Sequence, residues 1–134
     1  MKITLDTNVL VSATFWNGNS NTILEKVENK EIELVLSKEI IEEFARVLSY
    51  KEIQDKIKDK NLEMKRTIEK IISISTIVEP TEKLNIVEED PEDNKILECA
   101  KAGNVDFIIS GDNHLLKLKG FEVKIISPEE FLKK

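Results

Sequence analysis

The sequence predicts an α/β fold: a three-layer α/β/α sandwich built on a five-stranded parallel sheet. Short β-branched runs alternate with longer segments of helical period, which is typical of strands separated by helices. The short runs are almost continuously apolar, and such strands belong to sheets that are covered on both faces. With 134 residues and 40% hydrophobic residues, the chain has the size of one folded domain, and we expect residues 1–134 to form it.

Five apolar runs have the length and composition of buried strands. They are Lys2–Leu5, Ile32–Leu36, Ser75–Val78, Phe107–Ser110 and Val123–Ile126. Each is rich in the β-branched and aliphatic residues that favour strands, and each is separated from the next by enough residues for a crossover connection. Parallel pairing of the strands follows from this spacing.

Polar residues mark where several of the intervening helices begin. Ser37 precedes KEIIEEFARVL, with Glu39 in the first turn, and this is a typical N-cap. The sequence SPEE at residues 127–130 has the pattern of a capping box with proline at the first helical position. The sequence DPED at residues 90–93 opens a further helix, which Gly103 is expected to close.

The segment between Tyr50 and Ile74 has a charged, helical pattern, and we expect two helices there, broken near Asn61. Its part from Lys51 to Lys70 holds seven basic residues against five acidic ones. A solvated helix face is the simpler interpretation of this bias, and a nucleic-acid surface is the alternative. The whole chain has a formal net charge of −6, which argues against broad attraction to nucleic acid or anionic membranes. A polyanionic substrate would therefore need a local source of positive charge at its binding site.

Cys99 is the only cysteine and stands among Ile96, Leu97 and Ala100. A single cysteine excludes an intrachain disulfide, and its neighbours predict a small buried side chain. The first residues, MKITLDT, hold too short an apolar run for a secretory signal, and no stretch approaches the roughly 18 apolar residues of a membrane span. We expect a soluble, cytoplasmic protein without membrane contact.

Two acidic residues occupy positions that the hydrophobic pattern marks as inward-facing. Asp6 interrupts the apolar stretch ITLDTNVLV, where an unpaired buried carboxylate is costly or takes up a proton. Glu43 lies three residues after Ile40 and four before Val47, so it borders the apolar face of its helix. Its neighbour Glu42 points to solvent.

Asp93 and Asp112 each allow a structural and a functional interpretation. Asp93 precedes three apolar residues at helical spacing and shares their buried stripe, but a carboxylate at the third position of a helix also favours the helix dipole and satisfies backbone donors. Asp112 follows the apolar run Phe107–Ile109 in SGDNHLL, where it would cap the helix that begins near Asn113.

The predicted topology brings these acids to one edge of the sheet. Ligands of open parallel sheets bind beyond the carboxyl ends of the strands, and Asp6 and Asp112 follow two such ends. The helices that carry Glu43 and Asp93 can reach the same edge. Carboxylates without evident cationic partners repel one another, and a divalent cation resolves that conflict.

The ligand set points to a hard cation. Oxygen ligands select Mg²⁺ or Mn²⁺, because the single histidine and single cysteine cannot build a typical zinc site. Such an ion can also bridge an acidic pocket to a phosphate oxygen, which removes the difficulty posed by the net charge. The chemistry predicted is metal-assisted phosphodiester hydrolysis.

Four stretches in order, LDTNVL, SKEIIEEF, DPEDNKILECA and IISGDNHLL, resemble the acidic motifs of PIN-domain ribonucleases. The resemblance covers essentially the whole chain and is strongest to the small prokaryotic toxins of toxin-antitoxin systems, the VapC type. It implies cleavage of single-stranded RNA by activated water with Mg²⁺ or Mn²⁺, an antitoxin protein as partner, and a homodimer.

The resemblance also assigns roles by position. The catalytic, metal-binding acids would be Asp6, Glu43, Asp93 and Asp112. Asp90 would be an auxiliary acid or only a helix cap. The residues that orient acids or metal-bound water would be Thr7, Asn8 and Ser110. His114 stands where many relatives carry another acid, which puts a second tightly held metal in doubt; it would contact phosphate, assist a proton transfer or simply lie on the surface.

The aromatic pair Phe15 and Trp16 lies in the predicted loop TFWNGNSN. Exposed aromatic side chains stack on bases in proteins that bind single strands. The alternative is packing over the sheet or across a dimer interface.

Three other functions fit parts of the pattern. A housekeeping RNA-processing nuclease would carry the same acids as a toxin. A phosphatase or phosphoacceptor domain also places an Asp after its first strand, but haloacid-dehalogenase-like sites usually have an acid two residues later, where Asn8 stands, and neither fold accounts for Glu43. A non-catalytic, partner-binding α/β domain would have no need of four intact acids.

Overall fold

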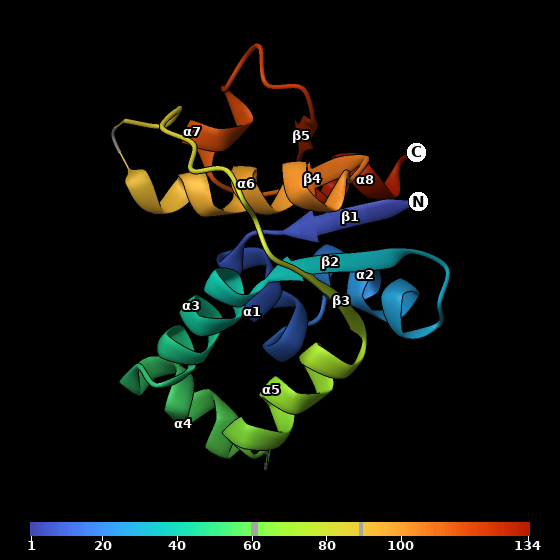
Figure 1. Ribbon diagram of the computed structural model, residues 1–134. Helices are drawn as coiled ribbons and strands as arrows, with labels where there is room; N and C mark the ends of the chain where they lie inside the picture. Colours follow the sequence, from blue (N-terminus) through green and yellow to red (C-terminus); the bar gives the residue numbers. More distant parts are fainter. Residues whose placement is uncertain (60–61, 89) are drawn as a thin grey trace.

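Figure 1 shows a computed structural model of the chain, which describes residues 1–59, 62–88 and 90–134. Its centre is a five-stranded sheet in the order β3-β2-β1-β4-β5, and every neighbouring pair is parallel. The strands are β1 (Lys2–Leu5), β2 (Glu33–Ser37), β3 (Ser75–Val78), β4 (Phe107–Ile109) and β5 (Lys124–Ile126). The predicted parallel sheet is confirmed, and each strand lies within one residue of its predicted bounds.

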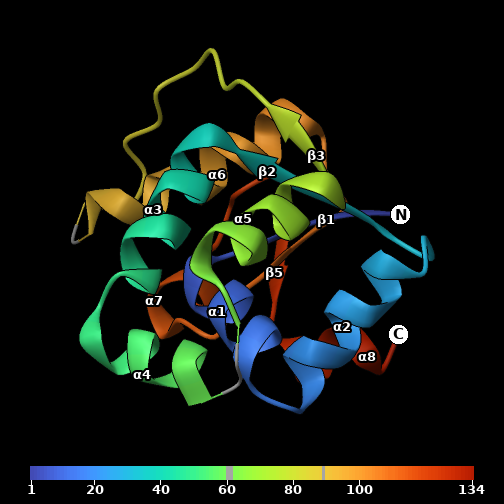
Figure 2. The same cartoon turned by 90° about the horizontal axis from the view of Figure 1, so that it is seen from below.

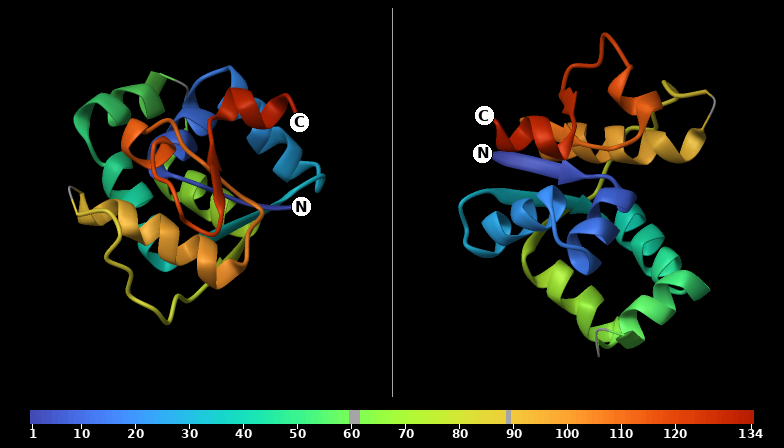
Figure 3. Two further views of the ribbon diagram at one scale, coloured as in Figure 1. Left: turned by 90° about the horizontal axis from the view of Figure 1, so that it is seen from above. Right: turned by 180° about the vertical axis from the view of Figure 1, so that it is seen from behind.

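Helices cover both faces of the sheet, which confirms the three-layer architecture (Figures 1 and 3). One face carries α1 (Thr7–Phe15), α2 (Asn19–Glu28), α3 (Lys38–Leu48), α4 (Lys51–Asp59) and α5 (Met64–Ser73). The opposite face carries the 3-10 turn η1 (Pro91–Asp93), α6 (Asn94–Gly103) and α7 (Asn113–Leu116). The last helix, α8 (Pro128–Leu132), packs beside α2 (Figure 2).

The strand order changes direction between β1 and β4. From β1 the chain moves outward to β2 and β3 with α1–α5 on one face, and it then crosses the other face through α6 to reach β4 and β5. The carboxyl ends of β1 and β4 therefore lie side by side. In open parallel sheets this reversal of strand order is the place where ligands bind.

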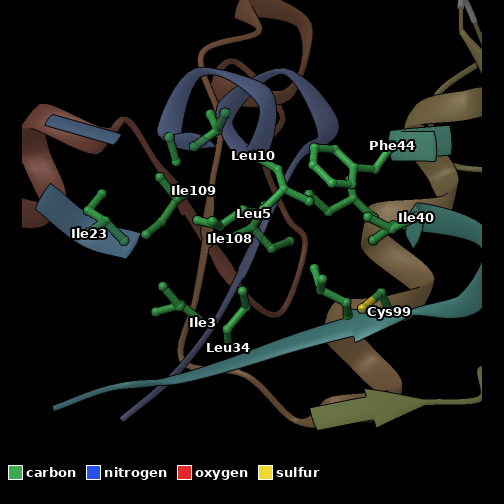
Figure 4. Packing of buried hydrophobic residues seen from close by; sticks show 14 of the residues in the cluster. Ile3, Leu5, Leu10, Ile23, Leu34, Ile40, Phe44, Cys99, Ile108 and Ile109 are labelled. Atoms are coloured by element: carbon green, nitrogen blue, oxygen red, sulfur yellow. The ribbon is translucent and has the colours of Figure 1, made fainter. Parts of the chain in front are cut away.

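Apolar side chains of the sheet and both helical layers form the core (Figure 4). Ile3, Leu5, Leu34 and Ile108 from the strands and Phe44 from α3 are fully buried. This burial fixes where α1 and α3 begin relative to the strand ends, and so it positions the residues that follow β1 and those on α3.

Cys99 lies on α6 and is fully buried, as the sequence predicts. Burial disfavours the thiolate and raises the pKa of the thiol to about 11, so this cysteine packs as a small apolar side chain.

The α6 region differs from prediction in two details. The α-helix begins at Asn94, after η1, so Asp93 ends a 3-10 turn and does not occupy the third position of an α-helix. Gly103 is the last residue of α6, but the left-handed residue that ends the helix is Asn104, with φ 51°. Gly103 has a different role: a Cβ there would lie 2.5 Å from Cγ1 of Val35, so its small size allows α6 to pack closely on β2.

The two helices predicted between Tyr50 and Ile74 are α4 and α5. The predicted break at Asn61 falls outside the described residues. Within the described ranges, no helix has the length and hydropathy needed to cross a membrane.

Candidate active site

The four predicted acids lie at the carboxyl edge of the sheet, around the ends of β1 and β4. Asp6 follows β1 and Asp112 follows β4, while Glu43 is on α3 and Asp93 ends η1. Asp6, Glu43 and Asp93 line a narrow cleft of about 30 Å³, which is the space of roughly one water molecule or ion. Carboxylate oxygens of Asp93 and Asp112 lie within 4.8 Å of each other. The fold thus gathers acids that are far apart in the sequence.

Asp6 is held through both carboxylate oxygens. Its Oδ1 accepts a hydrogen bond from the Val9 N–H at 2.8 Å as the N-cap of α1, and its Oδ2 accepts one from the Ser110 hydroxyl. The buried Ser110 Oγ accepts in turn from the Asp112 N–H at 2.9 Å. Burial raises the pKa of Asp6, and the bonds from Ser110 and Val9 oppose this rise. Ser110 therefore joins the ends of β1 and β4.

Asp93 carries a buried carboxylate oxygen without a partner. No hydrogen bond from the described residues reaches its Oδ2, and its side chain does not cap α6. Burial raises the pKa of Asp93 from 3.8 to about 6, and the charges of Asp90, Asp112 and Asp6 add to the rise. The prediction that the Asp93 side chain satisfies backbone donors of this helix is therefore wrong. A buried carboxylate oxygen with no hydrogen-bond partner among the described residues is available to a ligand such as a metal ion.

Asp112 caps a helix and also faces the other acids. Its Oδ1 accepts a hydrogen bond from the His114 N–H at 2.8 Å at the start of α7, as predicted for a cap. The Nδ1 of His114 lies 3.8 Å from the same oxygen. One ligand atom each from Asp93, Asp112 and His114 lie within 4.8 Å of one another. The two interpretations of Asp112 are thus compatible.

Of the four predicted acids, Glu43 has an arginine nearby, so the expectation that these acids lack cationic partners is wrong for Glu43. Glu43 is 24% exposed against 62% for Glu42, and it therefore faces inward as predicted. Arg46 Nη2 lies 3.7 Å from Glu43 and 3.9 Å from Glu92, while Lys95 Nζ lies 2.6 Å from Glu92. Sequence reasoning missed Arg46, Glu92 and Lys95, although the i,i+3 spacing of Glu43 with Arg46 and of Glu92 with Lys95 was the available signal.

The residues predicted to support the acids differ in their burial and contacts. Thr7 is buried and lines the cleft. Asp90 Oδ1 accepts a hydrogen bond from the Glu92 N–H at 3.1 Å, so Asp90 caps η1 while its charge acts on Asp93. Asn8 is exposed in the first turn of α1 and is not among the residues that line the cleft.

Asn94 anchors the segment that leads into η1. Its Oδ1 accepts hydrogen bonds from the N–H groups of Ile86 and Val87 at 3.0 and 2.9 Å, and its Nδ2 donates to the Val87 carbonyl at 3.0 Å. One turn further along α6, Glu98 accepts from the Leu84 N–H at 2.8 Å. Hydrogen bonds therefore hold the segment before η1 against α6, next to the acids.

The aromatic pair is divided between core and surface. Phe15 is the last residue of α1, not part of a loop, and is 1% exposed, which excludes it from base stacking. Trp16 is 43% exposed.

The residues of the cleft fit a hard divalent cation. Among the ion pairs formed by the described residues, none joins Asp6 or Asp93 to a lysine or arginine. Both acids have raised pKa values, and one oxygen of Asp93 is orphaned. Carboxylate oxygens in this number suit Mg²⁺ or Mn²⁺ better than softer ions.

Comparisons with known proteins agree with the fold. Among solved structures, the chain is similar to VapBC2 from Rickettsia felis bound to a DNA fragment from their promoter, with a TM-score of 0.61. The match covers 93% of this chain and 97% of the other chain at 16% sequence identity, which is a likeness of fold. Comparison with curated proteins gives no significant match.

The family comparison gives a direct result. Residues 2–114 match the model of the PIN domain. This range includes β1 to β4 and all four acids that line or border the cleft. The chain therefore belongs to the PIN-domain family.

Proposed function

We propose that this chain is a divalent-metal-dependent endoribonuclease that cleaves single-stranded RNA by activated water. PIN domains are generally nucleases, and the chain belongs to that family. The observation that carries the proposal is the convergence of Asp6, Glu43 and Asp93 on one cleft, with Asp112 beside it and an unpartnered oxygen on Asp93. A protein has no stability reason to gather like charges in this way.

The residues that would hold Mg²⁺ or Mn²⁺ are Asp6, Glu43 and Asp93, which line the cleft, and Asp112, which lies beside Asp93. When bound, the ion would lower the pKa of water and stabilise charge on the phosphate oxygens. Ser110 keeps Asp6 oriented, because its hydroxyl donates to Asp6 and accepts from the Asp112 backbone. Such supporting hydrogen bonds typically alter metal affinity or activity by 10–100-fold.

Lys95 supplies the positive charge for an RNA phosphate at the cleft. Its ammonium is the basic group among the lining residues, and Glu92 holds it at the rim. Arg46 also lies near Glu92, with its Nη2 at 3.9 Å from Oε2 of that residue. An incoming phosphate can replace Glu92 as the partner of these cations. They would thus give an acidic chain the local positive charge that it needs to bind RNA.

We further propose that the chain is the toxin of a toxin-antitoxin pair, acting in the cytoplasm as a homodimer with an antitoxin protein. Support comes from the resemblance of its motifs to VapC-type toxins and from the fold shared with a VapBC2 complex. A housekeeping RNA-processing nuclease would carry the same acids. Growth arrest on expression, relieved by a protein encoded beside this chain, distinguishes the toxin from that alternative.

Incubation of the purified protein with labelled single-stranded RNA tests the catalytic proposal. We expect cleavage with Mn²⁺, none in EDTA, and none from Asp6→Asn. Glu42→Gln, one residue from Glu43 but 62% exposed, is the matched control and should cleave like the wild type. Equal cleavage by the wild type and Asp6→Asn would contradict the proposal.

A further inference from the structure

Another concave surface includes the residues that follow the carboxyl end of β5. This groove is formed by Ser12, Trp16, residues 17–21 and residues 127–129, and its volume is about 330 Å³. It lies where α1 turns into α2 through Gly18, whose φ of 137° favours glycine, and where α8 begins beside α2 (Figure 2). The volume is at the lower end of the range of small-ligand sites, about 300–1,000 Å³.

Uncharged polar groups dominate the lining of the groove. It offers the amides of Asn17 and Asn19, the hydroxyls of Ser12 and Ser20, and the carboxylate of Glu129, and none of its lining residues is Lys or Arg. This set does not suit a phosphate. Amides and a carboxylate do pair with the donor and acceptor edges of nucleobases, so the groove suits a base.

Trp16 provides an aromatic surface at the groove. Its ring is 43% exposed, and the buried Phe15 meets it edge-on with 6.2 Å between ring centroids. Lys56 Nζ lies 5.4 Å from the centre of the Trp16 ring. Proteins that bind single strands combine aromatic side chains for base stacking with nearby cations that follow the backbone.

The strand ends set the separation between groove and cleft. Asp6, Ser110 and Ser127 directly follow the adjacent strands β1, β4 and β5. Neighbouring strands lie about 4.8 Å apart, so Ser127 is on the order of 10 Å from Asp6. Ser12 is six residues after Asp6 on α1, or about 9 Å along the helix axis. One extended strand can reach both places.

We propose that the groove is a base-binding subsite for the RNA substrate. An unpaired base stacks on Trp16 and presents its edge to Asn17, Asn19 and Glu129, while the strand continues to the acidic cleft. This inference rests on the proposed function and deepens it, because it gives the enzyme a means of choosing where along an RNA it cuts.

Trp16 is the only tryptophan of the chain, so its fluorescence reports stacking directly. The wild-type protein is titrated in EDTA, where no cleavage is expected, with a short single-stranded RNA of mixed sequence and with a duplex of the same sequence. We expect saturable quenching by the single strand and little by the duplex. Absence of quenching by the single strand at any concentration overturns the subsite.

Variants separate binding from chemistry. Trp16→Ala should lower kcat/KM for RNA roughly ten- to hundred-fold, the size of one base–aromatic stack. This decrease should come from a higher KM, with kcat unchanged. Trp16→Phe should recover most of the loss. Tyr50→Ala removes another exposed aromatic side chain, 49% exposed and outside the groove, and it should behave like the wild type.

The remaining outcomes are distinct. If Trp16→Ala and Tyr50→Ala cleave RNA equally, the subsite is refuted. If Trp16→Ala changes the sedimentation of the protein but not its RNA affinity, the groove is a contact between copies of the chain and the subsite is again refuted. If the single strand quenches Trp16 but the wild type never cleaves RNA, the subsite stands and the proposed nuclease function fails.

Discussion

Asp93→Asn should make the metal-free protein more stable while removing its response to metal. Asparagine is the uncharged analogue of protonated aspartate, so it removes the charge whose burial, together with repulsion from neighbouring acids, raises the pKa of Asp93. A pKa raised from 3.8 to about 6 corresponds to about 3 kcal/mol at neutral pH, at about 1.36 kcal/mol per pKa unit. Because the side chain is only partly buried, water screens part of this cost, and we expect a gain of about 1–2 kcal/mol. For 134 residues that is about 4–7 °C in Tm.

The size of the stability difference between wild type and Asp93→Asn depends on pH. The folded-state pKa of Asp93 is raised, so its contribution to stability is fully present below pH 4 and is lost as pH rises through about 6. Wild type and Asp93→Asn should therefore unfold at the same temperature near pH 3.5 and diverge between pH 4 and pH 7, with the variant higher.

Thermal unfolding followed by circular dichroism, with and without Mn²⁺, measures both effects. At 100 times its dissociation constant, Mn²⁺ should stabilise the wild type by about 2.7 kcal/mol and leave Asp93→Asn almost unchanged. Glu42→Gln, which replaces an exposed acid, should follow the wild type in both conditions. A variant that is less stable than the wild type at pH 7.5, or that keeps the full response to Mn²⁺, would refute the idea that Asp93 is a strained metal ligand.

Three further substitutions test other contacts. Ser110→Ala removes the hydroxyl between Asp6 and Asp112 and should weaken Mn²⁺ binding in calorimetry by about 10–100-fold; an unchanged affinity would assign Ser110 to packing alone. Lys95→Met should raise the KM for RNA and make it less dependent on salt, while the affinity for Mn²⁺ stays unchanged. Lys101→Met, on the same helix, is the control. An unaltered KM in Lys95→Met would rule out phosphate binding by Lys95. Gly103→Ala places a Cβ 2.5 Å from Val35 Cγ1 and should cost about 1–3 kcal/mol in denaturant unfolding, whereas a gain in stability would mean that Val35 moves aside freely.

The fold could be predicted well because its signals are local. The apolar runs around Ile3 and Ile108 and the cap at Ser37 each identify an element without knowledge of the rest of the chain. The inward orientation of Glu43 could also be predicted, since helical spacing alone places it beside Ile40.

What sequence could not supply was the pairing of side chains from different elements. The Arg46 contact with Glu92 joins α3 to the turn before α6, and no periodicity reports such a contact. The hydroxyl of Ser110 was predicted only as an orienting group, because its bond to Asp6 spans 104 residues. The residue that ends α6 could not be predicted, because a glycine near a helix end is typical of a helix terminator. Here Gly103 is required by close packing on Val35.

Asn94 holds the segment before η1 in place, and this affects the free energy with which Asp93 would bind a cation. Three hydrogen bonds hold the backbone of Ile86 and Val87 against α6, so the neighbouring Asp93 starts from a restricted set of positions before any ion arrives. A ligand that is already confined gives up less conformational entropy when it coordinates. If the proposed function holds, this restriction would tighten the binding of a metal ion, while the metal-free protein would remain less stable than a chain without the buried charge.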